Sequence, residues 1–283
     1  MSLPEEDSTR SRPEERSHTA AEEPGKVRIY VLPNLLTAGN LACGFFALTW
    51  IVKYQQGGDF EDINRAIRLI LAAFLFDLFD GRLARLAKKE SQFGREFDSL
   101  ADIVSFGVAP AFLIYRIVLQ EFEPGWVIAA IYLVCGGIRL ARFNVMSMQP
   151  SEGNGREFVG FPIPSAAALV VSVTMFIMWM VGHDKTLGNW RYLLPALMLL
   201  LSVLMVSSVR YPTFKNVDWT LYRSVTTFAV AVIVGMLLAL YFQVTLALLF
   251  IAYLFYGLAR PWVSKRWRRE IESDEEDEET EER

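Results

Sequence analysis

Four aspartates occur at fixed intervals within residues 77–102 of an otherwise apolar protein. Asp77 and Asp80 are three residues apart and Asp98 and Asp102 are four apart, so each pair shares one face of a helix. Two bare carboxylates about 5 Å apart, at an effective dielectric constant near 20, repel by roughly 3 kcal/mol. The cluster must therefore take up protons or bind cations. Because the stretch contains neither histidine nor cysteine, its oxygen ligands favour a divalent metal ion.

Two helices are needed to position these carboxylates. The first aspartate pair continues along one helical stripe through Gly81, Ala84 and Arg85, and the second pair follows Gly94 at four-residue spacing. A short linker separates the two stripes in the sequence. We therefore expect two consecutive helices whose polar faces meet.

The rest of the chain has the composition of a polytopic membrane protein. Of its 283 residues 53% are hydrophobic and 20 are phenylalanine, which is too apolar for an ordinary soluble domain. The apolar runs predict eight spans, at about 35–54, 66–79, 97–118, 126–138, 162–182, 192–209, 224–242 and 244–259. The second run covers only ~21 Å of a hydrocarbon core of ~30 Å. We expect an all-α bundle whose aspartates lie near a membrane interface and face other helices.

Polar tails flank the predicted membrane domain. Residues 1–26 are rich in Glu, Arg, Ser and Pro, and residues 263–283 form a charged segment that ends in the acidic block ESDEEDEETEER, so both are expected to be disordered. This leaves residues 27–262 as the membrane domain. The N-terminal tail lacks the apolar stretch of a cleavable signal peptide, so we expect the first span to direct insertion.

The distribution of Lys and Arg predicts the orientation. An even number of spans places both termini, the aspartates and most basic residues on one side. The opposite side carries Lys53, Arg65, Arg68, Arg116, Lys185 and Arg191. The positive-inside rule then predicts that the termini and the aspartate cluster are cytoplasmic, in a protein of the inner or plasma membrane.

The aspartate stretch matches the pattern D-x2-D-G-x2-A-R-x8-G-x3-D-x3-D. This pattern resembles, at every fixed position, the signature of the CDP-alcohol phosphotransferases. Stretches at 32–44, 97–111, 138–144, 160–168 and 209–215 are similar to those of bacterial and archaeal phosphatidylserine synthases. The resemblance covers nearly the whole membrane domain. It implies transfer of a phosphatidyl group from CDP-diacylglycerol to the hydroxyl of L-serine.

The resemblance also implies roles for the aspartates. Asp77, Asp80 and Asp98 would hold metal, and Asp102 would be shared between the second of two Mg²⁺ or Mn²⁺ ions and proton acceptance from serine. Asp98 is the other candidate for the catalytic base. Spacing alone does not decide between the two carboxylates.

Five further residues resemble the nucleotide and phosphate end of the family's site. Gly81 and Ala84 would leave room for the nucleotide, and Arg85 could donate a forked pair of hydrogen bonds to a phosphate. Asn34 and Thr37 lie in a family segment that meets the same end of the substrate. The structural alternatives are close helix packing for the two small residues, an interfacial arginine for Arg85, and a helix cap for Asn34 and Thr37.

The serine carboxylate requires a cationic or amide partner. The candidates are Arg139, Arg142, Asn144, Arg210 and Lys215. A topological role for these basic residues competes with a binding role. Because Arg139 and Arg142 are three residues apart and share a helix face, we favour an anion site there.

Other functions are compatible with part of this pattern. Within the same chemistry, the acceptor could be glycerol phosphate, inositol phosphate or choline, or the donor an archaeal ether lipid. An ion-coupled transporter would also keep acids in the membrane, but usually near the midplane and on both sides. A scaffold role for the tails has no supporting motif. From the resemblance we expect a homodimer in membrane lipid, with no nucleic-acid partner.

Overall fold

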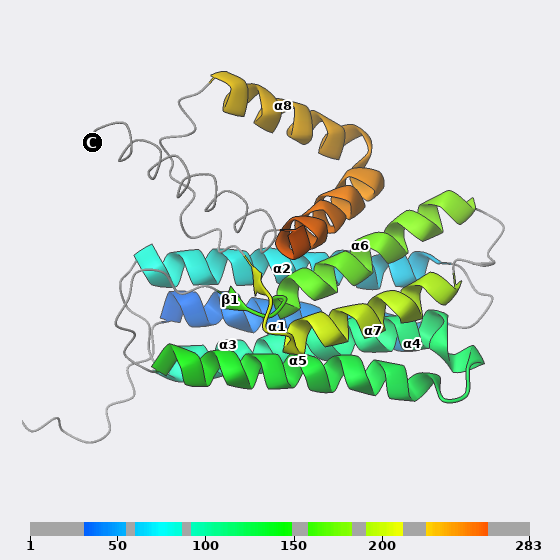
Figure 1. The fold of residues 1–283 in the computed structure, drawn as a ribbon, viewed down its shortest axis with the longest axis horizontal. Coiled ribbons are helices and arrows are strands. Elements are labelled where there is room, and N and C mark those ends of the chain that lie inside the picture. Colours follow the sequence, from blue (N-terminus) through cyan, green and yellow to red (C-terminus); the bar gives the residue numbers. More distant parts are fainter. Residues whose placement is uncertain are drawn as a thin grey trace, which may run out of the picture.

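The computed structural model describes residues 31–54, 60–86, 92–148, 158–182, 191–211 and 225–259. The two predicted tails, 1–26 and 263–283, lie outside these ranges. Between residues 31 and 206 the described helices form a bundle whose axes run broadly side by side (Figure 1). The predicted all-α fold is therefore confirmed. One antiparallel pair of two-residue strands, β1 (Phe158–Val159) and β2 (Arg210–Tyr211), accompanies the helices.

A helix lies at each of the eight apolar runs. The helices are α1 (Val31–Lys53), α2 (Glu61–Leu86), α3 (Gln92–Asp102), α4 (Ala109–Ile117), α5 (Gly125–Met148), α6 (Ile163–Val181), α7 (Leu193–Val206), α8 (Val225–Leu240) and the last described helix, Phe242–Ala259. A π-helical segment, Ile103–Val108, joins α3 to α4, and a 3₁₀ turn, Leu119–Glu121, follows α4.

Five described helices are long and apolar enough to cross a membrane. They are Leu32–Lys53, Gln92–Ile117, Gly125–Met146, Ile163–Val181 and Phe242–Ala259. This identifies a polytopic integral membrane protein, while the number of eight crossings stays a prediction.

Helix α2 is longer than the apolar run at 66–79 that predicted it. Its first turn carries acidic residues, which are favourable at a helix N-terminus, and Glu61 pairs with Arg65 one turn later.

The core lies around α6, which is apolar on all sides and mostly buried. The first helix packs against both α2 and α3, the two helices that carry the aspartates. It also comes close to the π-helical segment that follows α3, because Gly44 of α1 has no side chain: a Cβ there would lie 2.8 Å from the Cα of Ser105. By contrast, α8 stands apart from the other labelled helices (Figure 1), with Val232, Ile233 and Met236 more than half exposed.

The continuous helix formed by α3, the π-helical segment and α4 is wider at Ile103–Val108 than an α-helix. The amide of Ala109 donates to the carbonyl of Val104, five residues earlier, as in a π-helix. Pro110 has no N–H, and its ring would clash with the carbonyl of Phe106 in an ordinary α-helix. That carbonyl instead accepts a hydrogen bond of 3.2 Å from the hydroxyl of Tyr132 on α5. The proline therefore explains why the helix widens here.

A tight junction connects the start of α6 to the end of α7. Gly160 has a φ of 87°, and its amide donates to the carbonyl of Val209 at 2.8 Å. The amide of Phe161 donates to the carbonyl of Leu204 at 3.0 Å. A Cβ on Gly160 would collide with the carbonyl oxygen of Met205. Only glycine fits this position without strain.

We expect Gly160→Ala to lower the free energy of unfolding by about 2 kcal/mol, from strained backbone plus the collision with Met205. The matched control is Gly182→Ala, because Gly182 also has a positive φ, 60°, but open space around its Cβ position. Unfolding in detergent, followed by circular dichroism, would compare the two. Equal losses would show that the α6–α7 junction adds no constraint beyond the backbone angle.

Candidate metal and substrate site

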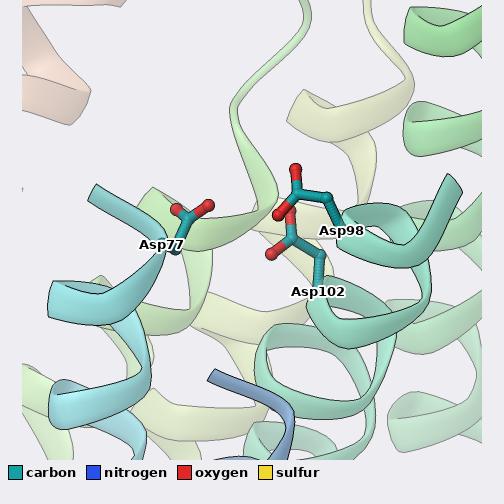
Figure 2. Close-up of side chains that lie close together, drawn as sticks. All are labelled: Asp77, Asp98 and Asp102. Carbon is teal, nitrogen blue, oxygen red and sulfur yellow. The ribbon is translucent and has the colours of Figure 1, made fainter. Parts of the chain in front are cut away.

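Three carboxylates meet between α2 and α3. Asp77 projects from α2, and Asp98 and Asp102 project from α3 toward it (Figure 2). One carboxylate oxygen from each lies within 4.8 Å of the other two. Asp102 is only 6% exposed. The structure thus brings together three of the four predicted aspartates at metal-binding spacing.

The fourth aspartate lies beside this group. Asp80 is 4% exposed and its Oδ2 accepts a hydrogen bond of 3.1 Å from the hydroxyl of Thr37 on α1. The carboxylate of Asp102 is within electrostatic range of Asp77, Asp98 and Asp80. All four predicted aspartates therefore lie close enough to interact electrostatically.

The donor set fits a divalent metal ion. Several carboxylates in a partly buried space repel one another unless a cation lies among them. Every side chain of the cluster is a hard oxygen donor, the ligand type that Mg²⁺, Mn²⁺ and Ca²⁺ prefer. The carboxylates also come from two separate helices, so they can coordinate an ion from two sides.

Helix α1 adds a residue that the sequence analysis missed. Asn40 is fully buried, and its Nδ2 donates to Oδ1 of Asp102 at 3.2 Å. Its main-chain carbonyl accepts from the hydroxyl of Ser105 at 2.9 Å. Asn40 follows Thr37 by three residues and so shares its helix face. That spacing was the available signal. Asn34 lies one further turn back, and its buried Nδ2 has no hydrogen-bond partner among the described residues.

The structure describes the surroundings of some of the residues that were predicted to contact the nucleotide. Gly81 is exposed, and a Cβ there would meet nothing within 4 Å, so space exists beside this turn of α2. Ala84 and Arg85 belong to the last turn of the same helix. Their side chains lie outside the described part of the structure.

Among the predicted serine-binding residues, Arg139 is buried and interacts electrostatically with the acids. It is 6% exposed, and its guanidinium lies 5.4 Å from the ring centroid of Phe143. The electrostatic partners of Arg139 include Asp102 and Asp77. A buried guanidinium beside carboxylates is a suitable anchor for a small anionic group.

Arg142 makes a different set of contacts. It donates to three carbonyls at the end of α7, those of Val206 at 3.1 Å, Ser207 at 3.2 Å and Met205 at 3.4 Å. Carbonyls in the last turn of a helix have no partner within the helix, so Arg142 caps α7. This arginine therefore ties α5 to α7.

Asn144 is also used between helices. Its Nδ2 donates to the hydroxyl of Ser99 on α3 at 2.9 Å. The two remaining candidates are not placed: Arg210 lies in β2 but its side chain is outside the described residues, and Lys215 is outside them altogether. The structure therefore groups Arg139 with the acids and places Arg142 and Asn144 at contacts between helices.

A family model and several known proteins are similar in sequence to this chain. The family model of CDP-alcohol phosphatidyltransferase matches residues 30–206. A CDP-diacylglycerol–serine O-phosphatidyltransferase of Helicobacter pylori strain J99 is 38% identical over 238 residues, 83% of this chain and 92% of that protein. The enzyme of the same name from Bacillus subtilis is 34% identical over 187 residues, 65% of this chain and 92% of the relative.

An archaetidylserine synthase of Methanothermobacter thermautotrophicus is 35% identical over 183 residues, which is 64% of this chain and 69% of that protein. The family match covers α1 to α7, including every aspartate of the site and both arginines on α5. The chain therefore belongs to the CDP-alcohol phosphatidyltransferase family.

Proposed function

We propose that the chain transfers a phosphatidyl group from CDP-diacylglycerol to the hydroxyl of L-serine, which gives phosphatidylserine and CMP. The observation that carries this proposal is the cluster of Asp77, Asp98 and Asp102, with ligand oxygens within 4.8 Å, inside the matched family region. The names of the similar proteins support serine as the acceptor.

The acidic residues account for metal and proton handling. We propose that Asp77, Asp80, Asp98 and Asp102 hold two divalent ions, Mg²⁺ or Mn²⁺. When bound, such ions neutralise negative charge on the pyrophosphate of the donor. Thr37 and Asn40 fix two of the carboxylates through hydrogen bonds. The site is therefore oriented before substrate arrives.

The reaction needs one proton acceptor. The serine oxygen forms a bond to the phosphorus, the bond from phosphorus to the CMP oxygen breaks, and the hydroxyl proton passes to a carboxylate. We assign this role to Asp102, with Asp98 as the other candidate. Asp102 is well suited because Asn40 donates to one of its oxygens, which stabilises a defined orientation of the carboxylate.

The substrates are proposed to bind on either side of the acids. Asn34, Thr37, Gly81, Ala84 and Arg85 would meet the nucleotide and its phosphates. Gly81 supports this assignment through the open space at its Cβ position.

The serine carboxylate is assigned to Arg139, since this guanidinium is buried beside the acids. Arg142 and Asn144 would support it by fixing α5 against α7 and α3. Arg210 and Lys215 remain candidates because they follow α7 in the sequence.

Several wider features belong to the same proposal. The site and both termini would face the cytoplasm, where Lys and Arg are concentrated in the sequence. Residues 27–262 would form the catalytic membrane domain between tails 1–26 and 263–283. The protein would act as a homodimer in the bilayer.

A second donor is worth testing, because the archaeal relative is named for an archaetidyl lipid. Purified protein would be given CDP-diacylglycerol or its ether-linked analogue, each with serine, glycerol phosphate or inositol phosphate. We expect CMP release and a serine-containing lipid with serine only. Product formed only with a phosphorylated alcohol would contradict the assignment.

We expect chelation by EDTA to reduce CMP release to background, because the carboxylates alone cannot neutralise the pyrophosphate. Adding excess Mg²⁺ or Mn²⁺ should restore the initial rate. The measurement is CMP release under saturating CDP-diacylglycerol and serine. Full activity after exhaustive chelation would contradict a metal-dependent mechanism.

A further inference from the structure

We propose that the π-helical segment Ile103–Val108 sets the direction in which Asp98 and Asp102 point, and that Tyr132 is a positioning residue for the transfer reaction. Tyr132 lies on α5 and contacts the segment, not the acids. The inference rests on the proposed function, because it takes the two carboxylates as metal-holding groups.

The segment begins directly after the acidic face of α3. Asp102 is the last residue of α3, and the π-helix starts at the next residue. A single π-helical turn acts as one extra residue in an α-helix, which changes the direction of the preceding side chains by about 100° relative to the following ones. Leu113 and Ile114 of α4 are fully buried, so packing fixes the orientation of the helix that follows the π-helical segment. The π-helical turn therefore sets the direction of the α3 face that carries Asp98 and Asp102.

Two hydrogen-bonding features keep the segment in this form. Pro110 cannot supply the N–H that the carbonyl of Phe106 would use in an α-helix. Tyr132 supplies the replacement donor at 3.2 Å and is itself fully buried. Without its hydroxyl a carbonyl in the core would lose this hydrogen bond, which is costly in an apolar environment.

A second anchor links the segment to the carboxylate. The hydroxyl of Ser105 donates to the main-chain carbonyl of Asn40 at 2.9 Å, and the side-chain amide of Asn40 donates to Asp102 at 3.2 Å. One residue of α1 therefore holds both the π-helical segment and the carboxylate before it. A shift of the segment is transmitted to Asp102 through this pair of bonds.

The test is the binding of Mn²⁺ to the full-length protein in detergent, without substrates, measured by electron paramagnetic resonance. Tyr132→Phe removes only the hydroxyl. We expect the Kd for Mn²⁺ to rise about tenfold, as when groups that orient metal ligands are removed. The control is Ser172→Ala, which removes a fully buried hydroxyl that donates to the carbonyl of Leu169 at 3.1 Å on α6. Its Kd should equal that of the wild type.

A second variant separates positioning from stability. Pro110→Ala restores an N–H and allows the α-helical bond to Phe106. We expect weaker Mn²⁺ binding with an unfolding temperature that is unchanged or higher, an outcome that a purely structural role would not give. If Pro110→Ala does not fold, Tyr132→Phe decides alone. Wild-type Mn²⁺ affinity in the folded variants would overturn the proposal.

The same measurements distinguish this proposal from the proposed function. Wild-type protein that binds Mn²⁺ but releases no CMP with serine would refute the serine assignment. Weaker Mn²⁺ binding by Tyr132→Phe would still support the positioning role in that case. Conversely, serine-dependent CMP release with unaltered metal binding in the variants would refute the positioning role only.

Discussion

Asp98→Asn should reduce kcat for CMP release by on the order of 10³-fold, the scale seen when a preorganised charge-stabilising group is lost. The amide has nearly the same shape as the carboxylate but no negative charge. It would therefore weaken metal binding in a cluster whose ligand oxygens lie within 4.8 Å of one another. CMP release at saturating substrate, together with Mn²⁺ binding, would measure both consequences.

The control for this substitution lies on the same helix. Glu96 of α3 is exposed, so Glu96→Gln removes a charge from α3 without touching the cluster. We expect wild-type kcat and Mn²⁺ affinity for Glu96→Gln. An Asp98→Asn protein that keeps its full rate would exclude Asp98 from the reaction.

Arg139→Lys is expected to raise the KM for serine by between about 10-fold and 100-fold, the factor that corresponds to the loss of one hydrogen bond between charged groups. Lysine keeps the positive charge beside Asp102 and Asp77 but loses the planar pair of donors that matches a carboxylate. The KM for CDP-diacylglycerol should stay near that of the wild type. Initial rates at varied serine concentration would provide the measurement.

Arg142→Lys provides the comparison for this second prediction. Its guanidinium binds the carbonyls of Met205, Val206 and Ser207, so the substitution should lower the unfolding temperature more than it changes the KM for serine. If the KM for serine instead rises in Arg142→Lys and not in Arg139→Lys, the two roles are reversed.

Helix positions and the acidic cluster were accessible from the sequence. Long apolar runs predict membrane helices because a bilayer leaves backbone groups no partner except one another. Residues spaced by three or four must share a helix face, which brought Asp98 and Asp102 together in the prediction. The short linker predicted that the stripe with Asp77 faces this pair, and the structure confirms that the three carboxylates meet.

The contacts between helices could not be predicted in the same way. Arg142 and Asn144 have the residue types of a substrate site, and only the packing of α5 shows which partners they reach. Pro110 signals a disturbed helix, but not that Tyr132 would take the freed carbonyl. Asn40 shares the helix face of Thr37, but that spacing does not reveal that Asp102 lies opposite it.

The hydrogen bond between Thr37 and Asp80 joins two helices that are consecutive in the chain. A buried carboxylate without a hydrogen-bond partner is costly, and Asp80, near the end of α2, is only 4% exposed. Because α1 and α2 emerge from the ribosome in succession, their hairpin can satisfy this carboxylate before any later helix is made. Asn40, also on α1, can donate to Asp102 only once α3 has been made. The order of synthesis therefore makes the hydrogen bond between Thr37 and Asp80 available before the one between Asn40 and Asp102.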